Sequence, residues 1–322
     1  MSPATVSRVL NGVDSVKAEH RERVLQAAQE LGYRPNMLAR NLRRQRVQMI
    51  AALVSDIENP HFAEMVRAVE DAAYSRRCRV LLCNSDESAE KQRSYMDVLA
   101  GERVSGVILV ANDPAAPEIA ELLDLGIALV AFDRPIRDPR ADSILIDNEG
   151  GGRDATRHLL DAGHERVAFI SGPLSVYTAT ERLAGYQGEM EDARLEPIVS
   201  YGDFRIEGGR LATERLLKER PDVTALIVAN NLMSLGALQA LNAHRGERPA
   251  LVGFDDPFWA PTVEPALTTL AQPVREMSES SVDLLFERMA RGRTEPRRRV
   301  FDFELRVRDS CGTAEPGAWR ES

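Results

Sequence analysis

The sequence contains few cysteines and few aromatic residues, and it has no long apolar run. Only three of its 322 residues are Cys. Cys78, Cys83 and Cys311 show neither the C-x-x-C spacing of a zinc site nor the even count of a disulfide framework. No apolar stretch approaches the ~18 residues of a transmembrane helix, and the first residues lack the pattern of a secretory leader. These absences predict a cytoplasmic protein without metal, cofactor or disulfides.

Motifs of catalysis are also lacking. The glycine-rich stretch EGGGRDA at 149–155 fits neither the G-x-G-x-x-G pattern nor a Walker phosphate loop. We expect its glycines to let the helix at 150–163 begin close to an adjoining lobe of the protein. His158, His164 and Ser171 have no spacing that indicates a catalytic triad. An enzyme is therefore the least favoured class, because no nucleophile, cofactor loop or metal-ligand set is recognisable.

What the chain does contain is enough apolar sequence for more than one core, since 43% of its residues are hydrophobic. Short apolar runs alternate with amphipathic helical patterns. The strand candidates are 49–54, 79–83, 106–110, 127–132, 166–170, 224–229 and 249–254, and the helix candidates are 60–76, 88–101, 115–125, 150–163, 178–193, 207–219, 231–243 and 273–291. Runs of Val, Ile and Leu between helices are typical of parallel sheets covered on both faces. The pattern predicts an α/β fold built from doubly wound parallel sheets.

The first twelve residues, MSPATVSRVLNG, have the pattern of a short helix with both ends marked. Ser2-Pro3 supplies an N-cap and a first-turn proline, and Asn11-Gly12 supplies the left-handed residue that ends a helix. One face is apolar, and the other carries small hydroxyls and Arg8, which suit phosphates and base edges in DNA. Taken alone, the stretch fits an ordinary capped surface helix better.

The segment that follows makes a DNA-binding helix the better interpretation of these twelve residues. A second amphipathic helix is predicted between Ser15 and Gly32, and an Arg-rich segment follows Asn36. Residues 1–46 contain nine Lys and Arg against four Asp and Glu, a net charge of +5, whereas the whole chain carries −9. A basic arm on an acidic body is typical of a protein that binds nucleic acid through one end.

Three stretches of this arm form a recognisable set: SPATVSRVLNG, RERVLQAAQELGYRPN and ARNLR. They resemble the headpiece of the lactose/galactose-repressor (LacI/GalR) family of bacterial transcription factors. The resemblance continues in family order through DIENPHFAEMVRAVEDAA, IDNEGGGRDATRHLLDAGHERVAFISGP, LIVANNLMSLGALQAL and LVGFDDP, and it covers nearly the whole chain. It implies a partial helix-turn-helix headpiece and a two-lobed, periplasmic-binding-protein-like core. The implied boundaries are 1–46 for the headpiece, with a hinge helix at 36–44, and 47–322 for the core, with an N-lobe at about 47–147 plus 273–299 and a C-lobe at about 148–272 plus 300–322.

The resemblance also implies a first helix that this sequence lacks. Family members carry about fourteen further residues at the start, enough for one helix and its lead-in. Met1 stands where they have Val, and a GUG codon is read as Val internally and as Met at a start. We hypothesise a start site upstream, with a genuinely shortened regulator as the alternative. An in-frame stop codon just before Met1 would contradict the hypothesis. Without that helix, we expect weak, salt-sensitive DNA binding.

The resemblance implies a set of DNA contacts in this arm. Arg8 would lie in the major groove, with Thr5 and Ser7 near bases or phosphates. Leu42 would insert as a wedge into a minor-groove step. The full implied set is Ser2, Ala4, Thr5, Ser7, Arg8, Asn11, Asn36, Ala39, Arg40, Leu42 and Arg43. A homodimer, or a tetramer built from it, would bind a pseudo-palindromic operator, because two-fold protein symmetry requires matching half-sites.

A ligand of such sheets is expected beyond the carboxyl ends of the strands. Asp133, Asn230 and Asp255 directly follow three apolar runs. Carried over position by position, the resemblance implies an effector pocket of His61, Phe62, Asp133, Thr178, Arg182, Phe204, Asn230 and Asp255. Carboxylates, an amide and a guanidinium suit hydroxyls or a carboxylate, and an aromatic face suits a sugar or base ring. The effector is therefore expected to be a sugar or another small polar metabolite.

Structural roles remain open for several of these residues. Asp133 and Asp255 also fit helix N-caps, and Arg182 also fits an ion pair between the lobes. Two positions depart from the family pattern, since Asn231 stands where an Asp is usual and His61 where an aromatic or small apolar residue is common.

The sequence thus predicts a transcriptional regulator, a repressor, whose operator affinity changes when an effector closes the two lobes. Whether that effector acts as an inducer or a corepressor stays open. The alternative is a solute-binding protein of the same two-lobed fold without a DNA function, which would need a leader and no basic arm. Asp255→Ala and Arg182→Ala are expected to abolish the effector response and leave the fold intact.

Overall fold

The computed structural model describes residues 5–6, 9, 18–30, 48–291 and 295–311, and the chain divides into two compact units, Met1–Gln48 and Met49–Ser322. In the first unit Thr5 is helical and half-buried, and helix α2 spans Ala18–Glu30. Val9 and Val24 are buried, as apolar stripes of two amphipathic helices should be. The hinge segment 36–44 and ten of the residues expected to contact DNA lie outside the described residues: Ser2, Ala4, Ser7, Arg8, Asn11, Asn36, Ala39, Arg40, Leu42 and Arg43.

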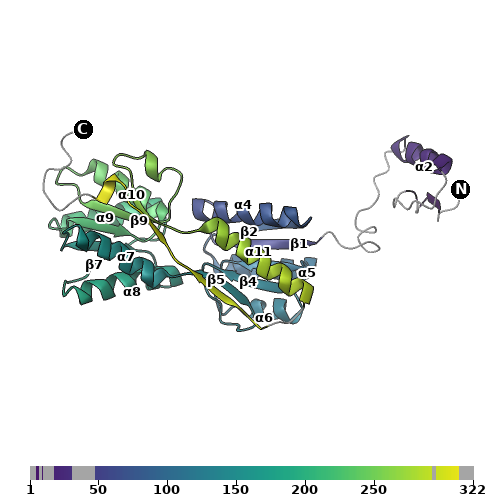
Figure 1. Ribbon diagram of the computed structural model, residues 1–322, viewed down its shortest axis with the longest axis horizontal. Helices are drawn as coiled ribbons and strands as arrows, with labels where there is room; N and C mark the ends of the chain where they lie inside the picture. The colour runs from purple at the N-terminus through teal and green to yellow at the C-terminus, as the bar shows by residue number, and fades with distance from the viewer. Residues whose placement is uncertain (1–4, 7–8, 10–17, 31–47, 292–294, 312–322) are drawn as a thin grey trace. The chain divides into compact units, whose positions relative to one another are not determined.

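The second unit contains two six-stranded sheets (Figure 1). The first has the order β11-β5-β4-β3-β1-β2 and the second β12-β10-β9-β8-β6-β7. Among the described strands only β10 and β12 pair antiparallel. The first sheet consists of β1 (Met49–Val54), β2 (Arg79–Asn84), β3 (Gly106–Leu109), β4 (Ala128–Phe132), β5 (Asp142–Ile146) and β11 (Arg298–Phe301). The second consists of β6 (Val167–Ser171), β7 (Ile198–Tyr201), β8 (Ala225–Val228), β9 (Ala250–Phe254), β10 (Thr268–Ala271) and β12 (Glu304–Arg306).

Helices cover the sheets, and each sheet with its helices forms one lobe (Figure 1). The first lobe has α4 (Pro60–Ser75), α5 (Ala89–Glu102), α6 (Pro117–Asp124) and α11 (Val274–Arg291), and the second has α7 (Asn148–Asp161), α8 (Tyr177–Asp192), α9 (Ile206–Glu219) and α10 (Asn231–Ala243). The central strands are buried along their whole length, as in the ALVAF sequence of β4. Continuous apolar strands need cover on both faces. The predicted pair of doubly wound, mainly parallel sheets is confirmed.

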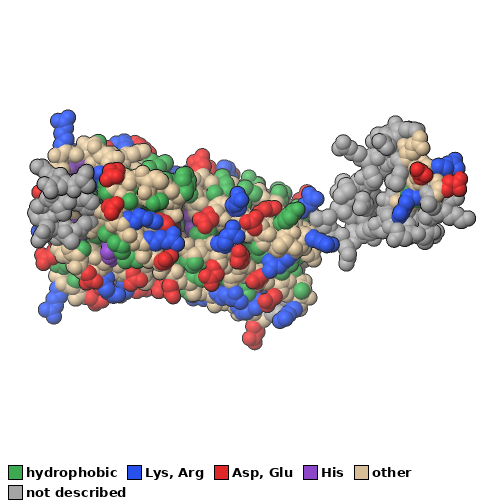
Figure 2. Space-filling view, turned by 45° about the horizontal axis from the view of Figure 1, so that its top comes forward, with side chains coloured by type: hydrophobic (Ala, Val, Ile, Leu, Met, Phe, Trp, Pro, Cys, Tyr) green, Lys and Arg blue, Asp and Glu red, His purple; other side chains and the backbone are tan. Residues whose placement is uncertain are grey.

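The chain crosses between the lobes three times within residues 48–311. The crossovers join β5 to α7, β10 to α11 and β11 to β12. On the face drawn in Figure 2, acidic and basic side chains are interspersed over this second unit. Every described helix is too short or too polar to span a bilayer.

Gly152 of the EGGGRDA stretch allows α7 to pack closely against α8 of the same lobe. A Cβ atom on Gly152 would collide with the carbonyl oxygen of Arg182 and lie 3.0 Å from the nitrogen of Tyr186, both in α8. In return, a Cβ atom on Gly185 would collide with the carbonyl oxygen of Glu149 in α7. From the sequence, we expect these glycines to let the helix begin close to the adjoining lobe, and the contact that Gly152 allows is made within one lobe.

Candidate functional site

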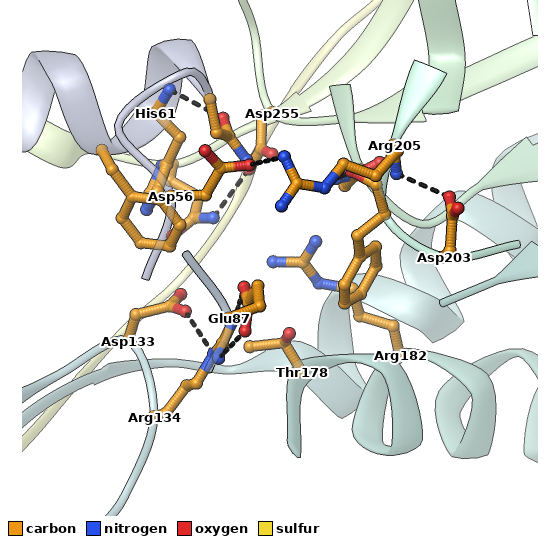
Figure 3. Close-up of a pocket in the computed structure, with 15 residues that line it drawn as sticks. Asp56, His61, Glu87, Asp133, Arg134, Thr178, Arg182, Asp203, Arg205 and Asp255 are labelled. Atoms are coloured by element: carbon orange, nitrogen blue, oxygen red, sulfur yellow. Dashed lines mark hydrogen bonds and ion pairs between the residues drawn. The ribbon is translucent and has the colours of Figure 1, made fainter. Parts of the chain in front are cut away.

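A cleft lies between the two lobes, at the carboxyl ends of strands from both sheets (Figure 3). It holds about 470 Å³ of space between the atoms that line it, part of it open to solvent. All eight residues expected to form the effector pocket line it. The full lining is Asp56, Asn59, His61, Phe62, Glu87, Asp133, Arg134, Thr178, Arg182, Asp203, Phe204, Arg205, Asn230, Asp255 and Gln272.

Four of these lining residues have a left-handed backbone: Glu87 (φ 54°), Asp133 (φ 63°), Phe204 (φ 65°) and Asp255 (φ 67°). Asp133 follows β4 directly, and Asp255 follows β9. Such backbone is uncommon for residues other than glycine, and it persists where the surrounding structure holds it, often at functional sites. Neither Asp precedes a helix, so the alternative interpretation of both as helix N-caps is wrong.

The two carboxylates are buried but keep free acceptor capacity. Asp255 is 6% exposed, and its Oδ1 accepts a hydrogen bond from Gln272 Nε2 at 2.7 Å. Asp133 is 4% exposed, and its Oδ2 lies 3.7 Å from Arg134 Nε. A carboxylate has about four acceptor positions. Both side chains can therefore accept hydrogen bonds from ligand hydroxyl groups.

Arg182 lies in α8, and its guanidinium points into the cleft (Figure 3). Its Nε donates to Asn148 Oδ1 at 2.8 Å and its Nη1 to the carbonyl oxygen of Ala229 at 2.6 Å. No carboxylate of the described residues lies within 4 Å of it, so the alternative of an ion pair between the lobes is wrong. Burial lowers the pKa of Arg182, and the charges of Asp255 and Asp133 only partly offset this. One buried cation thus faces two buried carboxylates.

Arg134 is neutralised by a partner that the sequence analysis missed. Its Nη1 and Nη2 donate to the two carboxylate oxygens of Glu87 at 2.8 and 2.6 Å. Burial disfavours both charges, but these bonds outweigh it and hold the pKa of Glu87 below and that of Arg134 above the ordinary value. This guanidinium is therefore occupied and contributes little attraction for an anionic ligand.

Arg205, at the N-cap of α9, joins the lobes at one side of the cleft. It lies 3.1 Å from Asp56 and 3.0 Å from Asp86, both in loops of the first lobe. Burial raises the pKa of Asp56 despite this contact, whereas the hydrogen bond from Arg205 lowers the pKa of Asp86. The link is 37% exposed on the Arg205 side, so its strength depends on salt.

A second link between the lobes is neutral and buried. Asn231 Nδ2 donates to Asn59 Oδ1 at 2.9 Å, and that oxygen also accepts the backbone N–H of His61 at 3.0 Å. An Asp at position 231, usual in the family that the sequence resembles, could not donate this hydrogen bond. The departure noted in the sequence therefore has a structural consequence, since the amide ties α10 to the start of α4.

His61 is the least satisfied polar group of the cleft. It is 6% exposed, and neither ring nitrogen has a hydrogen-bond partner among the described residues. Its ring meets Phe62 edge-on at 4.9 Å and lies 6.5 Å from Phe132. A neutral imidazole offers one donor and one acceptor, so a ligand hydroxyl group next to either nitrogen would supply a missing partner.

The remaining expected residues shape the cleft. Asn230 Oδ1 accepts the N–H of Met233 as the N-cap of α10, and its Nδ2 donates to the carbonyl oxygen of Phe204 at 3.2 Å. Thr178 and Phe62 are buried, and the Phe204 ring is half-buried. Asn230 thus has a structural role that can coexist with ligand contact.

Seven lining residues were missed. Asp56 lies two positions beyond the end of strand β1, and Gln272 lies one position beyond the end of strand β10. The position of Asp56 could have indicated a site residue, because strand β1 was predicted from the sequence. The others are Asn59, Glu87, Arg134, Asp203 and Arg205.

The lining holds five carboxylates against three guanidinium groups, so its formal charge disfavours anions. The described residues contain no group of three or more potential metal ligands.

The ionic link of Arg205 to Asp56 and Asp86 predicts that the arrangement of the two lobes depends on salt concentration. Arg205→Gln removes the positive charge between Asp56 and Asp86, which we expect to favour the open arrangement about fivefold, equivalent to ~1 kcal/mol for a partly exposed pair. Small-angle X-ray scattering should show a larger radius of gyration at low salt, and 1 M NaCl should bring the unaltered chain toward the same value.

The matched control is Arg210→Gln, because Arg210 pairs with Glu207 and Glu214 of its own helix. It should scatter like the unaltered chain. Equal radii of gyration for Arg205→Gln and Arg210→Gln at every salt concentration would contradict the link.

Comparison with known families gives two matches along the chain. Residues 47–254 match the model described as periplasmic binding proteins and sugar binding domain of LacI family. Residues 1–36 match the model described as bacterial regulatory proteins, lacI family.

Similar curated proteins extend over nearly the whole chain. The HTH-type transcriptional regulator CelR of Thermobifida fusca is 37% identical over 321 residues, which cover 95% of this chain and 94% of CelR. The ribose operon repressor of Halalkalibacterium halodurans is 35% identical, covering 98% of this chain and 95% of the repressor.

Solved structures of transcriptional regulators also superpose on nearly the whole chain. The transcriptional regulator CelR-cellobiose complex superposes with a TM-score of 0.76 at 35% identity, covering 96% of both chains. The lac repressor dimer bound to operator and the anti-inducer ONPF superposes with a TM-score of 0.82 at 28% identity, covering 97% of this chain and 96% of that chain.

Proposed function

This chain belongs to the LacI family of bacterial transcriptional regulators, and we propose that a small neutral sugar in the cleft between its lobes controls its affinity for operator DNA. The observation that carries the proposal is the convergence of the eight expected effector residues, which come from both lobes, on one cleft. A ligand that touches both lobes favours the arrangement in which they are closed, because it binds that arrangement more tightly.

The chemistry of the lining supports a neutral polyol. Asp133 and Asp255 accept hydrogen bonds from hydroxyl groups, Arg182 donates to a ring or hydroxyl oxygen, and the Phe62 and Phe204 rings pack on a sugar face. His61, Thr178 and Asn230 complete the contacts. A phosphate or carboxylate is disfavoured because the lining contains five carboxylates and three guanidinium groups, of which Arg134 and Arg205 are already paired.

The relatives suggest the first sugars to examine. A solved structure 35% identical to this chain is described as a CelR-cellobiose complex, and a relative 35% identical is named a ribose operon repressor. Cellobiose and ribose are therefore our first candidates. Their relative affinities for the cleft decide between them.

We extend the proposal to the domains and partners. Residues 1–46 act as headpiece and hinge and 47–322 as the effector-binding and dimerisation core. The chain acts as a cytoplasmic homodimer on a pseudo-palindromic operator, through the eleven residues named above, and it has no enzymatic activity. Regulation proceeds through the hinge segment 36–44, which effector binding orders or releases.

A solute-binding protein of the same fold is the second candidate, since the core model covers both classes. The match of residues 1–36 to the regulatory-protein model favours the regulator. Binding of duplex DNA separates the two, because a solute-binding protein has no use for it.

Isothermal titration calorimetry and thermal shift with matched sugars test the effector class. Cellobiose, ribose and glucose should include at least one ligand, and saturation at 100 times its Kd should add about 2.7 kcal/mol of stability. Glucose 6-phosphate and glucuronate, which differ from glucose by an anionic group at C6, should bind at least tenfold more weakly than the neutral sugar. Tight binding of the anionic sugars and none of the neutral ones would overturn the proposal.

A further inference from the structure

Phe303 lies in the crossover between β11 and β12 and joins the two lobes through its ring. Of the described residues, it is the one that packs against the hydrophobic cores of both lobes. A rotation of one lobe against the other must therefore move this ring relative to at least one of the two cores.

The same ring contacts the guanidinium that faces the cleft. The Cζ atom of Arg182 lies 5.5 Å from the centroid of the Phe303 ring and 4.5 Å from that of Phe254. The two rings meet edge to face, with centroids 5.3 Å apart and planes at 83°. Asn148, which accepts the Arg182 Nε hydrogen bond, begins α7 just after the β5 crossover. Residues from two of the three crossovers thus hold one side chain.

A glycine provides the space for this ring. A Cβ atom on Gly151 would lie 2.5 Å from Cδ2 and 2.7 Å from Cε2 of Phe303, and 3.2 Å from Cε1 of Phe254. The middle glycine of EGGGRDA is thereby explained, because any side chain there would displace the aromatic pair. The seat of Phe303 is therefore built by residues of three separate segments.

The contact matters because the charge is buried. Arg182 is 3% exposed, and no carboxylate of the described residues lies within 4 Å of its guanidinium. The faces of Phe and other aromatic rings attract cations, most strongly where water is excluded. Two ring faces and two hydrogen bonds therefore fix both the position and the tilt of the guanidinium.

We propose that Phe303 is a positioning residue: its ring orients the Arg182 guanidinium toward the effector and couples that orientation to the arrangement of the lobes. The proposal rests on the proposed function, because Arg182 must contact the sugar. When the lobes open, the ring leaves its seat and the guanidinium loses one of its two aromatic faces. A sugar that binds Arg182 therefore stabilises the crossover in its closed position.

The first measurement needs no effector. In a ¹H–¹⁵N spectrum of arginine side chains, the Arg182 Nε–Hε resonance is the one missing from Arg182→Lys. Phe303→Leu should shift it, since the ring current of one neighbour is lost, and Phe303→Tyr should return it near its original position. Phe301→Leu is the matched control, because Phe301 packs against the first-lobe core alone.

The second measurement is cellobiose or ribose binding by calorimetry, whichever binds the unaltered chain more tightly. Phe303→Leu should weaken the affinity about tenfold, the effect of a desolvated cation–π contact. Phe303→Tyr and Phe301→Leu should stay within about twofold. In combination with Arg182→Lys, Phe303→Leu should add little, because the two changes remove one interaction.

The outcomes separate the two ideas. Unchanged sugar affinity in both Arg182→Ala and Asp255→Asn defeats the proposed effector site. Unchanged affinity in Arg182→Ala alone defeats the positioning role of Phe303, because Arg182 then does not contact the sugar. Reduced affinity in Arg182→Ala together with unchanged affinity in Phe303→Leu defeats the positioning role of Phe303. An Arg182 resonance that does not move in Phe303→Leu defeats it as well, even where neither sugar binds.

Discussion

Asp255→Asn and Arg182→Ala should each weaken binding of the neutral sugar effector by about 10- to 150-fold, the loss expected for a charge-assisted hydrogen bond of ~1.5–3 kcal/mol. Asn suits position 255 better than Ala, because its φ of 67° is a region that Asn tolerates. The Asn side chain also keeps an acceptor for Gln272. The change therefore removes the charge with little strain, and calorimetry measures its effect on affinity.

The two variants should differ in stability. Asp255→Asn should melt within a few degrees of the unaltered chain. Arg182→Ala leaves Asn148 Oδ1 and the Ala229 carbonyl oxygen without their donors, so it should also lower the free energy of unfolding by about 2–4 kcal/mol. From the sequence, we expect an intact fold after substitution of either residue. The structure supports that expectation for position 255 and predicts a loss of stability for Arg182→Ala.

The control for both is Asp222→Asn, since Asp222 pairs with Arg220 on the surface and does not line the cleft. Sugar affinity should not change there. Unchanged affinity in both Asp255→Asn and Arg182→Ala would refute the assignment of the effector site.

Gly185→Ala should lower the free energy of unfolding by about 3 kcal/mol or more, because overpacking against backbone cannot relax by a side-chain rotation. The added Cβ would collide with the Glu149 carbonyl oxygen and lie 2.9 Å from the Arg153 nitrogen, both in the backbone of α7. Helices α7 and α8 must then separate. The melting temperature should fall by roughly 10 °C, at ~2–4 °C per kcal/mol for a body of this size.

Gly101→Ala is the matched control substitution, and it should raise stability where Gly185→Ala lowers it. Gly101 also lies in a helix, and a Cβ there meets nothing within 4 Å. Alanine loses less conformational entropy than glycine, so this variant should be up to ~1 kcal/mol more stable. A Gly185→Ala protein that melts no lower than Gly101→Ala would show that the helices do not approach as closely as described.

The strands that the sequence predicted are those that contain an uninterrupted apolar run. The missed ones carry polar side chains with distant partners. Thr268 and Thr269 of β10 are fully buried and hydrogen-bond to Arg308 and Asp256. In β5, Asp142 is fully buried and pairs with Arg288. A local pattern cannot reveal these partners, which lie 13 to 146 residues away.

Three of the four edge strands of the described sheets, β11, β12 and β7, were missed for another reason. The sequences RRVF of β11 and ELR of β12 are short and largely exposed. Edge strands often carry charge, which blunts pairing with other chains. β7, with the sequence IVSY, is likewise a short edge strand. Hydrophobic runs therefore locate the centres of both sheets and, apart from β2, do not reveal the edge strands.

The candidate site was predictable where chemistry follows a strand end. Asp133, Asn230 and Asp255 carry that signal, and the family resemblance supplied the other five residues. Arg205 and Phe303 carry no local signal, because their importance arises from contacts across the two lobes. The lobes meet only after the chain has crossed between them, so such contacts depend on the whole fold.

The central claim is that a sugar in the cleft and operator DNA influence each other's binding. Fluorescence anisotropy of a labelled duplex at low salt, where contacts to phosphates are strongest, measures this directly as cellobiose or ribose is added. At a sugar concentration ten times the Kd of the unaltered chain, we predict that one of these neutral sugars changes the duplex affinity at least fivefold for the unaltered chain and at most about twofold for Asp255→Asn. A fivefold change corresponds to a coupling free energy within the ~1–3 kcal/mol typical of coupled sites. Equal duplex affinity with and without sugar, or an equal sugar response in Asp255→Asn, would contradict the account.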